Sequence, residues 1–187
     1  MLSLGAKISE IVNSMVDQEE LSAPEGSPWA RGGTQQDARM MAVARLAAEN
    51  HEGCLVEIGC SRGGTTVGLA KIAREFGRSV IAVDPWENDA EYQLFLKNTY
   101  EYRDVIDVVR LPSEHQAAIA HIKSHPLCFA YIDGKHTNEN CALDMETVNH
   151  APVICVDDLW SEELIRAFNE SPREEIWNES CKEGYIC

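Results

Sequence analysis

Basic residues are scarce in this sequence, and long apolar runs are missing. Its 187 residues include 16 Lys and Arg against 31 Asp and Glu, which gives a formal net charge of −15. Nucleic acids and anionic membrane surfaces are bound through clustered Lys and Arg. A membrane-spanning helix needs about 20 consecutive apolar residues, and no run approaches that length. The composition therefore predicts a partner that is neither nucleic acid nor membrane.

Targeting signals and paired cysteines are missing as well. Residues 1–21 hold one Lys and several acids, which fits neither a secretory signal nor a transit peptide and predicts a cytoplasmic location. The seven cysteines contain no Cys-x-x-Cys pair. Most of them are expected to be reduced structural thiols in a reducing compartment.

The sequence does contain a regular alternation of short apolar runs with amphipathic segments. It predicts one domain over residues 1–187 of the α/β class, with a doubly wound, mostly parallel seven-stranded sheet and helices on both faces. The expected strands are 54–58, 79–83, 105–111, 127–132, 152–156, 174–179 and 185–187. The expected helices are 4–16, 35–50, 65–76, 90–100, 113–124, 138–149 and 162–169, and residues 22–33 are expected to form a loop.

Four of the expected strands end in an acidic residue or a glycine-rich turn. These ends fall at Gly59, Asp84, Asp133 and Asp157. Ligands of open α/β sheets bind at the carboxyl ends of the strands. The four positions therefore mark the expected binding site.

An acid and three glycines surround the end of the first expected strand. Glu57 precedes Gly59, and Gly63 and Gly64 close the turn before the next helix. Glycines let the backbone turn sharply and approach a ligand, and free N–H groups at the helix start donate hydrogen bonds. The Gly-x-Gly-x-x-Gly spacing of nicotinamide dinucleotide sites is absent. A carboxylate at Glu57 suits an ammonium group better than a pyrophosphate, although the turn could also be purely structural.

Asp84 follows the second expected strand, 27 positions after Glu57, where a carboxylate can accept both hydroxyls of a ribose. Together with Pro85-Trp86, this pattern resembles motif I and the next acidic position of class I S-adenosylmethionine-dependent methyltransferases, and the resemblance runs from about Thr34 to the C-terminus. It implies a Rossmann-like fold with a cofactor-binding core over residues 51–187, preceded by a helix and a lid-like loop within residues 1–40. The implied S-adenosylmethionine-binding residues here are Glu57, Gly59, Ser61, Gly63, Gly64, Thr65, Asp84, Pro85 and Trp86. For Trp86, plain core packing is the alternative.

A second acidic cluster is expected at the ends of the fourth and fifth strands. Adjacent strands lie about 5 Å apart, so Asp133 can meet Asp157 and Asp158 there. Carboxylates brought together repel one another unless a cation neutralises them, and Mg²⁺, Ca²⁺ and Mn²⁺ prefer such oxygen ligands. The alternative is structural, with Asp157 capping a helix with help from Ser161 and Asp133 serving as a turn residue.

This cluster is similar to that of the metal-dependent small-molecule O-methyltransferases, which include the catechol type and the macrolide- and cephalosporin-tailoring types. The resemblance implies Mg²⁺, or another divalent cation, bound by Asp133, Asp157 and Asp158, with Asp133 also bordering the cofactor. It implies His136 as general base, with Lys135 as second choice, and it places Ser113 and Glu114 near the adenine. The remaining histidines, at positions 51, 115, 121, 125 and 150, are interpreted as isolated surface residues.

The expected function is methyl transfer from S-adenosylmethionine to a hydroxyl of a small molecule. The Asp157-Asp158 pair resembles the sugar-tailoring types more than the catechol type, which implies a sugar or polyketide acceptor over a phenolic one, and a homodimer is possible. Two alternatives stay open: a metal-free methyltransferase of the same fold, and a non-catalytic module that binds S-adenosylmethionine.

Overall fold

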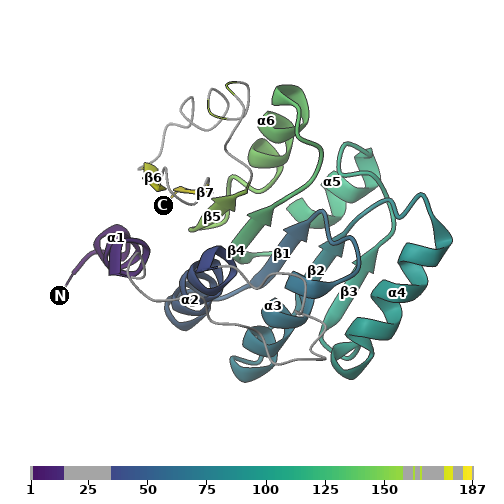
Figure 1. The fold of residues 1–187 in the computed structure, drawn as a ribbon, viewed down its shortest axis with the longest axis horizontal. Coiled ribbons are helices and arrows are strands. Elements are labelled where there is room, and N and C mark those ends of the chain that lie inside the picture. Colours follow the sequence, from purple (N-terminus) through teal and green to yellow (C-terminus); the bar gives the residue numbers. More distant parts are fainter. Residues whose placement is uncertain are drawn as a thin grey trace.

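A computed structural model describes residues 2–14, 35–157, 162, 165, 175–178 and 183–186 of the chain. It forms a twisted sheet flanked by helices (Figure 1). The strands are β1 (Cys54–Ile58), β2 (Val80–Val83), β3 (Ile106–Val109), β4 (Leu127–Ile132), β5 (Ile154–Val156), β6 (Glu175–Asn178) and β7 (Glu183–Ile186). The helices are α1 (Leu4–Ser14), α2 (Gln35–Asn50), α3 (Gly64–Glu75), α4 (Asp89–Thr99), α5 (Gln116–Lys123) and α6 (Asn138–Thr147), with a 3₁₀ turn, η2, at Tyr100–Tyr102.

The strands lie in the order β3-β2-β1-β4-β5-β7-β6. The first five pair in parallel, and β7 runs antiparallel to both β5 and β6. These five parallel strands with their helices confirm the predicted Rossmann-like α/β core. The strand order reverses between β1 and β4, and such a switch point is where open α/β sheets bind ligands.

Helices cover both faces of the parallel strands. On one face, Leu55, Val80 and Phe129 share an apolar layer with side chains of α1, α2 and α3. On the other face, Val56 and Ile81 pack in a layer with side chains of α5 and α6. Strands buried on both faces need apolar residues at every position, which explains why the runs at β1, β2 and β4 are almost continuously apolar.

Several element bounds differ from the sequence prediction. Helix α5 begins at Gln116, not at residue 113, because the imidazole Nδ1 of His115 accepts a hydrogen bond from the Ala117 N–H (3.2 Å) and caps the helix there. The expected loop over residues 22–33 lies outside the described residues. So does most of the expected helix over 162–169, of which Glu162 and Ile165 are described and helical. In the described part of the chain, no helix combines the length and the apolar character that crossing a membrane requires.

Candidate functional site

The turn after β1 packs directly against the end of β4 at the switch point. Gly59 has a φ of 91°, and the Cβ atom of any other residue there would lie 2.0 Å from the backbone oxygen of Asp133. The Asp133 N–H donates to the Ile58 carbonyl (2.8 Å), so the two strand ends are also hydrogen-bonded. Both the backbone angle and the contact require glycine at position 59.

Asp84 holds the turn after β1 to the turn after β2. Its Oδ2 accepts hydrogen bonds from the N–H groups of Cys60 (3.0 Å) and Ser61 (2.9 Å), and its Oδ1 accepts from the Trp86 N–H (2.7 Å). Two carboxylate oxygens offer about four acceptor positions, and these three hydrogen bonds leave about one of them unused. Asp84 could therefore accept about one further hydrogen bond from a ribose hydroxyl, and this contact stays a prediction.

Helix α3 begins with an open N-terminus. Gly63 is its N-cap residue, with a φ of 81° and no side-chain hydrogen bond to the first turn. A Cβ atom built on Gly64 would have no neighbouring atom within 4 Å. Because the first N–H groups of a helix have no partner within it, this end can receive an acceptor group. Neither the backbone angle nor a close neighbour requires glycine at position 64. The open space beside Gly64 is therefore consistent with a ligand-binding site.

Glu57 lies beneath the turn, only 1% exposed. The Thr66 hydroxyl donates to its Oε2 at 2.5 Å. Burial raises the pKa of Glu57 to about 8, against the lowering effect of the Thr66 hydrogen bond. The carboxyl group is therefore largely protonated near neutral pH, and a cation above it would draw it toward the ionised form.

Trp86 is part of the core, as the alternative reading of the sequence had it. The side chain is 2% exposed, and its ring centroid lies 4.5 Å from Phe95 and 5.1 Å from Tyr92. Its Nε1 donates to the Ser61 carbonyl at 2.5 Å. The ring therefore packs in the core, and the contact of Trp86 with the cofactor stays a prediction. Trp86 supports the turn after β1 from below, while the neighbouring Pro85 is half-buried.

Asp133 and Asp157 follow the ends of the neighbouring strands β4 and β5, whose residues Ile132 and Val156 are partners in the sheet. The Tyr131 hydroxyl donates to Asp157 Oδ2 (2.6 Å), and His136 Nε2 lies 3.6 Å from Asp133 Oδ1. Burial and the two carboxylates raise the pKa of Tyr131 well above its usual value, so its hydroxyl stays protonated and keeps donating. Sequence reasoning missed Tyr131, although a tyrosine two positions before an expected ligand was the available signal.

The predicted divalent-cation site is only partly contained in the described residues. Asp133 and Asp157 supply hard oxygen atoms at one edge of the sheet, which suits Mg²⁺. Within the described ranges, no third carboxylate or imidazole joins these two in a compact group of ligand atoms. The third predicted ligand, Asp158, lies outside the described residues. The metal therefore stays a prediction.

Lys135, the second choice of general base, forms an exposed ion pair. Its ammonium group pairs with Glu114 Oε1 at 2.5 Å, and both side chains are substantially exposed. The hydrogen bond and the charge of Glu114 raise the pKa of Lys135, while Lys135 lowers that of Glu114. A lysine whose protonated form is favoured is a poor proton acceptor, which leaves His136 as the first choice, and both roles stay predictions.

Asp144 on α6 is a buried acid that the sequence prediction overlooked. It is 1% exposed, and the carboxylate lies 3.3 Å from where a Cβ atom of Gly134 would stand. Burial raises its pKa to about 6, opposed by the nearby hydroxyl of Ser113. Ser113, expected at the adenine, thus also faces this acid. The signal was present, because position 144 falls on the same face of the helix as the buried Cys141, Met145 and Val148.

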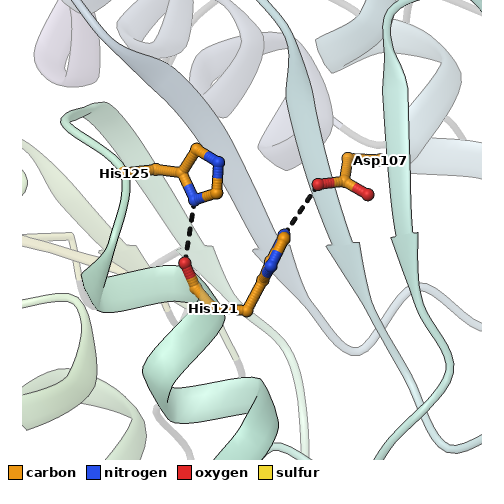
Figure 2. A group of neighbouring side chains, drawn as sticks. All are labelled: Asp107, His121 and His125. Atoms are coloured by element: carbon orange, nitrogen blue, oxygen red, sulfur yellow. Dashed lines mark hydrogen bonds and ion pairs between the residues drawn. The ribbon is translucent and has the colours of Figure 1, made fainter.

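Two histidines predicted to be isolated are not. His121 near the end of α5 and His125 in the turn that follows converge with Asp107 of β3 (Figure 2). One ligand atom from each of these three side chains lies within 4.8 Å of the other two. Asp107 is near the start of β3, so this group is at the amino ends of the strands, away from the turns described above. The prediction failed because Asp107 joins the two histidines through the packing of α5 against β3, which spacing along the chain does not reveal.

A separate groove of about 860 Å³ lies beside α1, lined by residues that include Lys7, Ile11 and Leu46. None of the described residues that line it stands at a strand end. It is therefore not the site predicted from the sequence.

Comparison with protein families matches residues 56–154, more than half of the chain, to a family described as a methyltransferase domain. The segment spans β1 to β5 and includes every described residue of the candidate site except the last acid, Asp157. A comparison with curated proteins gave no match.

Solved structures share the fold at low sequence identity. The calicheamicin-biosynthesis enzyme CalS11, a TDP-rhamnose 3′-O-methyltransferase, is 12% identical with a TM-score of 0.66, covering 97% of this chain and 93% of its own. The methyltransferase PaMTH1 of Podospora anserina, solved with SAH, is 12% identical with a TM-score of 0.62, covering 100% and 88%. An O-methyltransferase of Bacillus cereus in complex with SAH is 15% identical with a TM-score of 0.57, covering 100% and 90%. At these identities the likeness establishes the fold.

Proposed function

Since this chain belongs to the methyltransferase domain family, we propose that it is a class I S-adenosylmethionine-dependent methyltransferase that methylates a hydroxyl group of a small molecule. The proposal rests on two groups of residues that lie on either side of the switch point. On one side is the open start of α3 at Gly64, next to the turn held by Asp84. On the other side are Asp133, His136 and Asp157. A methyl donor and an acceptor can therefore lie next to each other.

The cofactor side is assigned to the turn after β1. The open N–H groups at Gly64 and Thr65 would bind acceptor atoms of S-adenosylmethionine, and the remaining acceptor position of Asp84 would bind a ribose hydroxyl. Glu57 lies under the turn, where it would ionise as the ammonium group of the cofactor arrives. When bound, S-adenosylmethionine supplies an electrophilic methyl group on a sulfonium.

The acceptor side is assigned to the ends of β4 and β5. His136 lies 3.6 Å from Asp133, which would orient its ring and stabilise the imidazolium that forms when it takes the proton of the acceptor hydroxyl. Tyr131 fixes the carboxylate of Asp157 beside them. A divalent cation held by Asp133 and Asp157, together with Asp158, would supply Lewis acidity toward that hydroxyl.

The acceptor class follows from this side of the site. A cation with three protein oxygens keeps open positions for an acceptor with neighbouring hydroxyls. The Asp157-Asp158 pair, which resembles that of the sugar-tailoring types, favours a sugar or polyketide acceptor. The sugar nucleotide in the name of CalS11, which shares the fold, supports the same direction. The five described free cysteines, 54, 60, 128, 141 and 155, support a reducing compartment, so we propose the cytoplasm as location.

A metal-free methyltransferase is the second candidate. It is favoured by the lack of a third ligand beside Asp133 and Asp157 in the described part of the chain. In that case the two acids would orient His136 and Tyr131 without a cation, and activity would resist a chelator.

The test is calorimetric titration of S-adenosylmethionine into the purified chain, with Mg²⁺ and with excess chelator, using two matched glycine variants. Gly64→Ala adds a methyl group where the fold has room, so the free energy of unfolding should be unchanged or higher by about 0.5–1 kcal/mol, while cofactor affinity falls. Gly77→Ala adds one where φ is 65° and space is open. It should lower stability by about 1 kcal/mol and leave affinity alone.

The outcomes separate the candidates. Cofactor binding followed by a saturable Mg²⁺ site in the cofactor complex supports the metal-dependent enzyme. Cofactor binding with no Mg²⁺ binding to that complex supports the metal-free one. Unchanged affinity in Gly64→Ala would refute the assignment of the cofactor to the start of α3.

A further inference from the structure

The group formed by Asp107, His121 and His125, here called the β3–α5 cluster, has no part in the proposed methyl transfer. It lies near the amino end of β3, whereas the transfer site lies at the carboxyl ends of the strands. Its side chains come from an edge strand and from the end of the helix that packs over it (Figure 2). His121 is 34% exposed and Asp107 is 48% exposed, so solutes can reach both.

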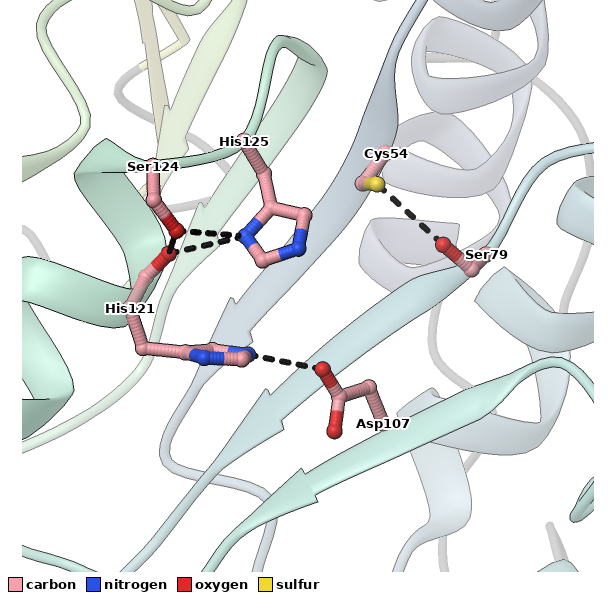
Figure 3. A network of polar contacts seen from close by, with 6 residues as sticks. All are labelled: Cys54, Ser79, Asp107, His121, Ser124 and His125. Carbon is pink, nitrogen blue, oxygen red and sulfur yellow. Dashed lines mark hydrogen bonds and ion pairs between the residues drawn. The ribbon is translucent and has the colours of Figure 1, made fainter.

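Hydrogen bonds fix which nitrogen of His125 carries its proton. Its Nδ1 lies 2.8 Å from the His121 carbonyl oxygen and 3.1 Å from the Ser124 hydroxyl (Figure 3). The carbonyl can only accept, and the Ser124 hydroxyl already donates to that same carbonyl at 2.7 Å. The proton of the neutral ring is therefore on Nδ1, which leaves a lone pair on Nε2. Figure 2 shows that nitrogen on the side of the ring that faces Asp107.

This is the arrangement found around metal-binding histidines. Their second ring nitrogen usually donates to a carbonyl or carboxylate, which sets the tautomer and holds the ring in place. His121 meanwhile donates from Nε2 to Asp107 Oδ2 at 2.7 Å, and a metal ion entering there would replace that proton. Three potential ligand atoms within 4.8 Å of one another need only a modest closure to surround one ion.

We propose that the β3–α5 cluster is a binding site for a divalent transition-metal ion of the Zn²⁺ class, separate from the methyl-transfer site. Two imidazoles and one carboxylate form a donor set that suits Zn²⁺, Co²⁺ or Ni²⁺ and not Mg²⁺, which prefers oxygen ligands only. Three protein ligands leave a fourth position for water. The bound ion ties the edge strand β3 to the end of α5.

Cysteine is the main competitor for such an ion. Cys54 lies at the start of β1, in the neighbourhood shown in Figure 3, but its Sγ contacts Ser79 Oγ at 3.1 Å and is not one of the three grouped side chains. The test must therefore distinguish imidazole ligands from thiolate ligands.

The experiment is titration of Co²⁺ into the full chain without a histidine tag, followed by visible and near-ultraviolet absorption. With excess Mg²⁺ present to occupy the carboxylates of the methyl-transfer site, the expected result is one Co²⁺ ion per chain with ligand-field bands and no thiolate charge-transfer band. His125→Gln and Asp107→Asn should each weaken binding by at least about 100-fold, because losing a ligand exceeds the 10–100-fold effect of losing an outer partner. Ser124→Ala should weaken it by about tenfold.

The matched control is His115→Asn. It removes an imidazole from the same helix while keeping a side chain that caps the N-terminus, so Co²⁺ affinity should not change. Circular dichroism shows that each variant is folded. The proposal is overturned if the wild-type chain binds no Co²⁺, if both ligand variants bind as well as wild type, or if a thiolate band appears and is lost in Cys54→Ser.

Discussion

The two ends of the parallel strands use acidic side chains in different ways. At the carboxyl ends, the fold itself engages the acids: Asp84 accepts three backbone hydrogen bonds, and Asp157 accepts one from Tyr131. At the amino end of β3, Asp107 meets an imidazole, and a second imidazole lies close by. The first end is built mainly of hard oxygen atoms and backbone donors, which suit an organic cofactor and a hard cation, with the His136 imidazole beside Asp133. The second groups two imidazoles with one carboxylate, which suits a borderline metal.

This difference teaches that a shared scaffold does not give its two ends the same chemistry. The carboxyl end is organised by turns with special backbone angles, such as those at Gly59 and Gly63. The amino-end group is organised by strand register and the end of one helix, with no positive φ among its members. A substitution that disrupts the residues at one end should therefore leave the arrangement at the other end intact.

The largest effect is expected from Gly59→Ala, which breaks the carboxyl end. Its Cβ atom would lie 2.0 Å from the Asp133 carbonyl oxygen, at a backbone φ of 91°. Strain and displaced strand ends should lower the free energy of unfolding by more than about 4 kcal/mol, the range of severe single substitutions. Urea unfolding measures this. A loss no greater than that of Gly77→Ala would show that the two turns are not locked together.

The next effect is a pH dependence that arises from Glu57. Its pKa is about 8 in the folded chain against an ordinary value of 4.5, so the folded state retains a proton that the unfolded state loses. Stability from this group is present below pH 4.5 and is lost as the pH rises through about 8. Relative to wild type, Glu57→Gln should gain stability between pH 5 and 9, on the order of 4 kcal/mol at most.

Urea unfolding of both proteins across that range measures the difference. Thr66→Val, which removes the hydrogen bond to Glu57, should move the transition to higher pH. A wild-type curve parallel to that of Glu57→Gln would contradict the raised pKa.

The smallest effect is expected from Asp84→Asn and Asp107→Asn, which each replace one carboxylate oxygen with an amide nitrogen, one at either end of the strands. Asp84→Asn removes the charge and one acceptor oxygen from three backbone N–H donors, so S-adenosylmethionine affinity should fall by about 10–100-fold, as expected for hydrogen bonds to charged groups. Asp107→Asn should leave that affinity unchanged while weakening Co²⁺ binding by at least about 100-fold. Calorimetry of both ligands with both variants tests the independence of the two ends, and a crossed effect would refute it.

Much of the carboxyl end could be predicted because its signals are local. An apolar run, a glycine turn and an acid at the strand end are visible in consecutive residues. Gly59, Asp84 and Asp133 were therefore placed correctly, at the carboxyl ends of the strands. The parallel core followed from the alternation of strands and helices.

What sequence reasoning missed depends on contacts between distant segments. The pairing of Lys135 with Glu114 depends on how two turns meet, 21 residues apart. Asp107 and His121 are 14 residues apart and face each other only because α5 packs over β3. The core position of the Trp86 ring could not be decided from the sequence, because an aromatic residue beside a turn can point to the ligand or beneath the turn. In the structure it packs against Phe95.

The contact between Gly59 and Asp133 also bears on motion. Since the Asp133 N–H is bonded to Ile58, and no room exists between Gly59 and the Asp133 carbonyl, a fluctuation that displaces one turn carries the other with it. The separation between the cofactor side and the acceptor side should therefore vary less than the position of either. An in-line displacement depends on that separation. If the two turns move together through the Gly59–Asp133 contact, the methyl donor and the acceptor would stay aligned without closure of a lid.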